Sequence, residues 1–137
     1  ICPSLRNRLA SKLRPPIHTT FRGRDVYGMG PSSSGGIVVA LMLNILERFD
    51  LKADGPRSPR TLHRVAEAMR RAYFTRATAI ADPDFVAVPV ETLVSKPYAD
   101  DLARTITDHA TPSAQLADFP IIDAGGTHTT HVTADSA

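Results

Sequence analysis

The chain has a single cysteine, little net charge and few long apolar runs, and each of these features argues against a class of protein. Its one cysteine, Cys2, excludes an internal disulfide and a cysteine-based metal cluster. Sixteen basic and fourteen acidic side chains leave a formal net charge of +2, which gives no support for nucleic-acid binding. No apolar run approaches the ~18 to 20 residues that a membrane-spanning helix needs. We therefore expect no nucleic-acid partner and no membrane span in this segment.

The composition is that of an ordinary globular domain. Of the 137 residues, 42% are hydrophobic and 22% are charged, which is unlike a disordered chain. The chain starts at Ile1 without the charged-then-apolar layout of a signal peptide, and it ends within an apparent strand. We expect an internal segment of a longer polypeptide, whose localisation these residues alone leave unknown.

The first elements are predicted to be a helix and a hairpin. Residues 4–14 carry leucines four apart, which indicates one apolar helix face that ends at Pro15. Residues 17–21 and 25–29 are β-prone runs around a short connection with Gly23, as in a hairpin. The basic residues among the leucines are typical of a solvated helix face: Arg6, Arg8, Lys12 and Arg14.

Three further helices are predicted from caps and apolar periodicity. Residues 31–36 form a loop in which Ser34 can cap a helix over 37–49, and this helix is apolar on every face. Ser58 and Pro59 open a second helix, and residues 95–97 open a third. The second helix has one apolar stripe at three-four spacing, through which such a helix typically packs: Leu62, Val65, Ala66, Met69, Ala72, Tyr73, Ala77 and Ile80. Its remaining faces hold Arg64, Glu67, Arg70, Arg71 and Arg76.

The last residues contain the best candidate for chemistry. After a predicted loop over 110–124, the diglycine Gly125-Gly126 leads into Thr129, Thr130 and His131. A threonine at a chain terminus can use its own α-amine, with a pKa near ~7.7 to 8.0, as the base for its hydroxyl. Such a terminus arises if the Thr129 hydroxyl attacks the carbonyl of His128 and water then releases the ester. By itself the pattern is also typical of a turn that enters a threonine-rich strand.

Motifs lie along nearly the whole chain, in segments 14–16, 21–27, 31–36, 41–47 with 50–51, 63 with 67–69, 82–86 with 88–89, 98–99 and 125–131. In this order they resemble the motifs of the γ-glutamyltranspeptidase family. Two departures are that Gly30-Pro31 precedes three serines where the family usually has two prolines before a serine pair, and that Phe74-Thr75 replaces the family's Ala-Asp. The strand after Thr129 also looks about one residue short.

The resemblance implies an α/β fold, the αββα sandwich of N-terminal nucleophile hydrolases, with this segment mostly helical plus a short hairpin and a terminal strand. It implies that residues 1–128 end the large subunit and residues 129–137 begin the small one. Thr129 would be the catalytic nucleophile, and the self-cleavage site would be His128-Thr129. The substrate would be glutathione or a related γ-glutamyl compound, whose acyl group passes to water, an amino acid or a peptide. No metal or organic cofactor is implied, and the location would be periplasmic or extracellular.

Substrate-binding and oxyanion groups are expected outside these residues, so the segment alone should be inactive. Two rival functions stay open. One is a cephalosporin-type acylase of the same family, and the other is a relative that neither cleaves itself nor catalyses a reaction and acts as a structural or interaction protein.

Other candidate sites are weaker than Thr129. A metal site of His128, His131, His109 and Asp123 is disfavoured because residues three apart in a strand point to opposite faces. Residues 32–34 lack the Gly-x-Ser-x-Gly pattern of a serine hydrolase. The acidic residues of 82–84 and 100–101 are typical of a turn and of a helix N-terminus.

Overall fold

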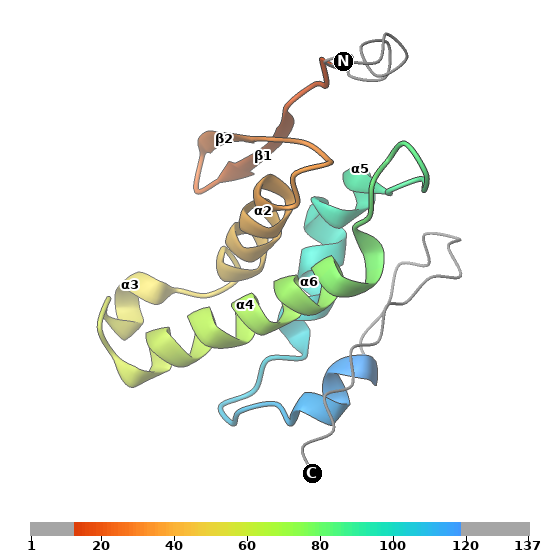
Figure 1. Cartoon of the computed structure of the whole chain (residues 1–137). Helices are drawn as coiled ribbons and strands as arrows, with labels where there is room; N and C mark the ends of the chain where they lie inside the picture. The colour runs from red at the N-terminus through yellow and green to blue at the C-terminus, as the bar shows by residue number, and fades with distance from the viewer. Residues whose placement is uncertain (1–12, 119–137) are drawn as a thin grey trace, which may run out of the picture.

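The computed structural model describes residues 13–118, which form a helical bundle with one antiparallel hairpin (Figure 1). The expected mostly helical segment with a short hairpin is therefore confirmed, whereas the expected terminal strand lies outside the described residues. The elements are β1 (Ile17–Phe21), β2 (Arg24–Gly28), α2 (Gly35–Leu46), α3 (Leu51–Asp54), α4 (Pro59–Ala79), α5 (Val90–Leu93), α6 (Lys96–Arg104) and the 3-10 helix η1 (Ser113–Asp118).

The chain enters the bundle through an extended segment and the hairpin. Leu13 and Arg14 are not helical, so the predicted helix over 4–14 is wrong at its described end. The physical reason is Pro15, whose ring disfavours helical backbone in the residue before it. The hairpin is confirmed, with Ile17 opposite Gly28 and Phe21 opposite Arg24. Its turn is one residue shorter than predicted, because Arg22 and Gly23 have φ values of 50° and 76° and close a two-residue loop.

Helix α2 is the centre of the described core. It contacts both strands and α4, α5 and α6, and its Ile37, Leu41 and Ile45 are at most 1% exposed. Buried Asn44 accepts a hydrogen bond from Thr19 Oγ1 (2.9 Å) and donates to the Val94 carbonyl (2.7 Å), which joins β1 and the C-terminal end of α5 to α2. The prediction of burial on every side is only partly correct, since Val39 is 50% exposed.

Helix α4 begins as predicted but presents a different face to the core. The Ser58 hydroxyl accepts a hydrogen bond from the Thr61 amide, and Pro59 occupies the first turn. The predicted apolar stripe is mostly exposed, because Leu62, Met69 and Tyr73 are 60%, 39% and 51% exposed. The buried face instead carries small and polar side chains: Thr61, Glu67, Ala68, Arg71, Ala72, Thr75 and Ala79.

Helix α6 begins where it was predicted to begin. The Ser95 hydroxyl accepts from the Tyr98 amide, Tyr98 and Leu102 are buried, and Ile106 packs partly buried against the core. The predicted turn before it is present, with Asp82 accepting from the Asp84 amide at 3.0 Å. Within residues 13–118, no helix combines the length and apolar character needed to cross a membrane.

Candidate functional site

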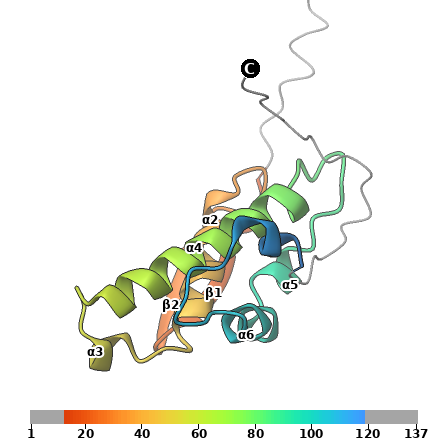
Figure 2. The same ribbon diagram turned by 90° about the horizontal axis from the view of Figure 1, so that it is seen from below.

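The proposed nucleophile and the proposed cleavage bond lie outside the described residues. Thr129 and His128 stay predictions, as do the discounted metal candidates Asp123 and His131. The structure does describe the chain that leads toward them. After α6 this chain turns back and runs beside α4 to η1, as both ribbon views show (Figures 1 and 2). We call residues 105–113 of this chain the return segment.

A buried ion pair on α4 holds the return segment. Glu67 and Arg71 lie one helical turn apart, Arg71 Nη1 donates to Glu67 Oε2 at 2.5 Å, and the two side chains are 2% and 0% exposed. Thr111 donates to the same carboxylate twice, from its hydroxyl to Oε2 (2.6 Å) and from its amide to Oε1 (3.2 Å). Residue 111 is therefore fixed through both its backbone and its side chain.

Arg71 extends the same network to the end of α6. Its Nε donates to Thr105 Oγ1 at 2.8 Å and its Nη2 donates to the Thr105 carbonyl at 2.8 Å. The Nη2 group also donates to the Thr111 hydroxyl at 3.2 Å. We name Glu67, Arg71, Thr105 and Thr111 the Glu67–Arg71 cluster. Its members satisfy one another, as a buried charged pair requires.

The environment of Glu67 keeps its carboxylate ionised. Burial favours the neutral acid, but hydrogen bonds from Thr111, Arg71 and Arg70 stabilise the charged form more and lower the pKa from 4.5 to about 2. The Glu67 carboxylate is therefore ionised at neutral pH and pairs with Arg71.

Further contacts hold the return segment along α4. His63 Nε2 donates to the Thr107 carbonyl at 2.8 Å, and Arg70 Nη2 donates to Ser113 Oγ at 3.3 Å. Arg60 lies 3.8 Å from the Asp108 carboxylate. Sequence reasoning missed this face of α4. The four-residue spacing of Glu67 and Arg71 was visible, but their partners in the return segment are 34 to 44 residues away along the chain.

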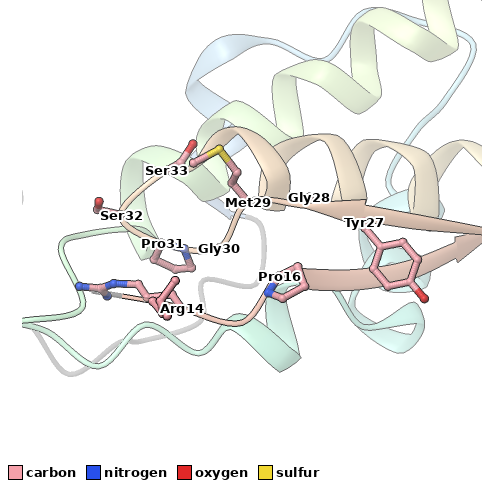
Figure 3. A pocket seen from close by; sticks show the side chains of 10 residues that line it. Arg14, Pro16, Tyr27, Gly28, Met29, Gly30, Pro31, Ser32 and Ser33 are labelled. Carbon is pink, nitrogen blue, oxygen red and sulfur yellow. The ribbon is translucent and has the colours of Figure 1, made fainter. Parts of the chain in front are cut away.

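The serine-rich loop follows β2 and borders a cavity, as the close-up of Pro31, Ser32 and Ser33 shows (Figure 3). Its Ser32 and Ser33, with Arg14, Tyr27 and other residues, line an open cavity of about 630 Å³. Ser34 is the N-cap residue of α2, as predicted, but its hydroxyl accepts from Arg76 Nε at 2.8 Å and makes no cap hydrogen bond.

The glycines that flank this loop have a steric role. A Cβ on Gly36 would lie 2.3 Å from the Met29 carbonyl oxygen, and one on Gly28 would lie 2.9 Å from Gly36 Cα. Close backbone approach of β2 to α2 therefore requires glycine at both positions. This steric requirement is sufficient to explain the two glycines, and no phosphate-binding or nucleophile site needs to be invoked for them.

The other acidic and histidine candidates are engaged or exposed. Asp84 pairs with Arg14, Asp100 with Arg48 and Asp101 with Arg104. His109 is exposed. Across residues 13–118, no three histidine, cysteine, aspartate or glutamate side chains gather as a metal site would need.

Comparisons with known proteins agree over most of the chain. A family model described as Gamma-glutamyltranspeptidase matches residues 7–136. The Acylase ACY 1 proenzyme of Pseudomonas sp. (strain V22) is 41% identical over 126 residues, covering 92% of this chain and 22% of that protein. The Glutathione hydrolase proenzyme of Escherichia coli (strain K12) is 41% identical over 119 residues, covering 86% of this chain and 20% of that protein.

A solved structure supports the same relationship. The gamma-glutamyltranspeptidase of Helicobacter pylori superposes with a TM-score of 0.73 and 38% identity, covering 89% of this chain and 33% of that chain. The architecture is thus that of part of an N-terminal nucleophile hydrolase. The chain belongs to the γ-glutamyltranspeptidase family, and it spans about a fifth of the length of the curated relatives that it matches.

Proposed function

We propose that the whole protein is a γ-glutamyltransferase or glutathione hydrolase that cuts its own precursor before Thr129. Residues 1–128 would then end the large subunit, and residues 129–137 would begin the small one. The supporting observation is the family match, which runs through the candidate bond to residue 136. Two relatives that are 41% identical are named proenzymes, a name given to a precursor.

The proposed maturation needs one nucleophile and one labile bond. Thr129 Oγ1 adds to the His128 carbonyl carbon and the C–N bond of the 128–129 peptide breaks, which leaves His128 as an ester on the hydroxyl. Water hydrolyses this ester, returning the hydroxyl and freeing the α-amine of Thr129. Gly125 and Gly126 suit the distortion that this attack requires, because glycine tolerates backbone conformations that other residues resist.

In the mature enzyme the freed amine takes the proton of the Thr129 hydroxyl. The hydroxyl then attacks the γ-glutamyl amide, the amine of the donor leaves, and the acyl group passes to water, an amino acid or a peptide. These steps use only side-chain and terminal groups, so the proposal includes no metal or organic cofactor. The partners are a small γ-glutamyl substrate and the two subunits of one precursor, and the proposed location is the periplasm or the cell exterior.

The intact mass of the full-length gene product tests the cleavage. We expect two chains with Thr129 at the start of the second, one uncut chain for Thr129→Ala, and cleavage retained at a lower rate for Thr129→Ser, which keeps a hydroxyl. A folded parent that stays in one piece would contradict the proposal and favour the non-cleaving relative.

The acylase alternative is favoured by one specific observation, the 41% identity to Acylase ACY 1. It shares the proposed maturation, so cleavage does not separate the two. Hydrolysis of a γ-glutamyl anilide and of a cephalosporin amide by the same processed preparation does. We expect turnover of the anilide, and turnover of the cephalosporin amide alone would support the acylase.

A further inference from the structure

Strand β2 has an open edge. The two-residue turn of the hairpin makes its flanking residues, Phe21 and Arg24, a hydrogen-bonded pair. Hydrogen-bonded and non-hydrogen-bonded pairs alternate along an antiparallel ladder, so Asp25 and Tyr27 direct their amides and carbonyls away from β1. In the described part of the chain the sheet has two strands, and these outward groups therefore meet no further strand.

The outward edge of β1 is partly covered, which supports this register. Thr20 is opposite Asp25 and directs its carbonyl away from β2 in the same way. That carbonyl accepts a hydrogen bond from Lys96 Nζ at 2.5 Å. Within residues 13–118, no comparable contact joins the backbone of Asp25 or Tyr27 to another element. Strand β2 also has no proline and no bulge, features with which many edge strands prevent further pairing.

A cavity with exposed apolar walls lies at the end of the same strand. It is the cavity of about 630 Å³ beside the serine-rich loop, and Tyr27, Met29 and Pro16 line it (Figure 3). Tyr27 and Met29 are 67% and 72% exposed, and Leu13, which also lines the cavity, is fully exposed. Three large exposed apolar side chains therefore gather at one place. Contiguous exposed apolar surface of this kind marks an interaction site.

We propose that β2 pairs with one further strand, an extended segment of the same polypeptide from outside residues 13–118, which places an apolar side chain in the cavity. Strand addition of this kind uses backbone hydrogen bonds along the edge for affinity and side-chain pockets for specificity. Here Asp25 and Tyr27 supply the backbone groups, and Tyr27 and Met29 supply part of the pocket wall.

The length of the relatives argues for an occupant from the same polypeptide. This chain covers 22% of one relative and 20% of another at 41% identity, so about four-fifths of each lies outside the matched part. A segment of the same polypeptide is also held at a high local concentration near the edge, which favours it over a separate partner of equal intrinsic affinity.

Amide exchange in the full-length protein, followed residue by residue, tests the edge. The amide of Val26 faces β1 and is the internal reference for a paired amide. If β2 pairs with a further strand, the amides of Asp25 and Tyr27 are hydrogen-bonded as well. We expect both to exchange within about tenfold of the rate of Val26. Faster exchange than this at Asp25 and Tyr27 overturns the proposal.

Proline at position 27 is the sharpest variant, and position 18 supplies its matched control. His18 is opposite Tyr27, with the two ring centroids 4.8 Å apart. Tyr27→Pro and His18→Pro each remove this ring contact and one outward amide, and both keep the hydrogen-bonded pairs of the hairpin. His18→Pro also removes a 2.8 Å contact to the Asp25 carboxylate, which makes the control stricter.

The two proline variants should differ at the neighbouring amide. We expect Tyr27→Pro to speed exchange of the Asp25 amide by about fivefold or more, the effect of one lost backbone hydrogen bond. His18→Pro should change that rate by less. Equal effects of the two variants would show that the amide of residue 27 has no partner, and would overturn the proposal.

Cross-linking identifies the occupant. p-Benzoylphenylalanine in place of Tyr27 keeps an aromatic ring at the cavity and reacts on irradiation with C–H bonds within reach. In a mixture of isotope-labelled and unlabelled full-length protein, we expect products within one polypeptide, joined to a segment outside residues 13–118. Products that join labelled to unlabelled copies, or no product outside residues 13–118, would overturn this occupant. None of these measurements needs cleavage before Thr129, so their failure leaves the proposed function intact.

Discussion

Helices α2 and α4 lie side by side, yet they are buried by opposite means. Helix α2 buries Ile37, Leu41 and Ile45, as a core helix ordinarily does. Helix α4 buries alanines with Glu67 and Arg71 and turns its larger apolar side chains outward. The difference shows that α2 packs through large apolar side chains, whereas α4 packs through small ones and also forms hydrogen bonds with residues 105–113.

The largest expected effect comes from breaking the buried pair on α4. Arg71→Ala leaves Glu67 buried without its main cation, and removal of one partner of such a pair costs about 3–5 kcal/mol. Thermal and urea unfolding of the Thr129→Ala precursor would measure the loss. The double change Glu67→Leu with Arg71→Met should cost less than Arg71→Ala alone, because it leaves no buried charge. A larger loss in the double variant would contradict this account of α4.

A cavity created in the core beside α2 should destabilise the fold slightly less than Arg71→Ala does. Ile45 is fully buried, and Ile45→Ala should lower the free energy of unfolding by about 2–5 kcal/mol through lost packing. The same unfolding experiment measures it. Because Ile45 lies away from the return segment, amide exchange in residues 105–113 should change less than in Arg71→Ala. An equal change in both variants would remove the distinction between the helices.

Acid should weaken the α4 cluster selectively. The pKa of Glu67 is lowered to about 2 in the folded state, from an ordinary value of 4.5. Its contribution to stability is therefore present above pH 4.5 and is lost as the pH falls from 4.5 toward 2. Unfolding curves of Glu67→Gln should show a shallower dependence on pH in this range.

Glu47→Gln is the control for the acid effect. The pKa of Glu47 is also lowered, by hydrogen bonds from Lys96 and from the Arg22 amide, but Glu47 is outside the cluster. Protonation of Glu67 should also speed amide exchange in residues 105–113 as the return segment is released, and Glu47→Gln should leave this acid-induced release unchanged. A parental pH dependence in Glu67→Gln would show that the cluster does not govern this release.

The smallest effect is expected on the outward face of α4. Leu62 is 60% exposed, so Leu62→Gln should change the free energy of unfolding by no more than about 0.5 kcal/mol. Ala68→Gln, on the buried face, is the matched comparison and should be strongly destabilising. A loss of several kcal/mol for Leu62→Gln in the full-length precursor would show that another part of the protein covers this face.

Local signals in the sequence predicted most of the described elements. Ser58 with Pro59, Ser95 with Pro97, and Gly23 in a short connection each act through neighbouring backbone groups, so no knowledge of the fold was needed. The buried face of α4 was predicted wrongly, because it depends on residues that are distant in the sequence. The helix carries both an apolar stripe and a face of alanines with Glu67 and Arg71, and only the positions of its partners decide which one is buried.

Part of the candidate site could likewise be proposed from the sequence, and part could not. The threonine at position 129 can be proposed from the residues around it and from resemblance, although it lies outside the described structure. The cluster that holds the return segment could not be predicted, because Thr111 meets Glu67 across 44 residues. Ser34 is a smaller example, since its hydroxyl bonds Arg76, 42 residues away, in place of its own helix.

The most direct test of the account is the N-terminal residue of the smaller product made by the full-length protein. We expect Thr129 at that terminus in the parent and no new terminus in Thr129→Ala. A folded parent that remains one chain, or a new terminus at another residue, would contradict the account.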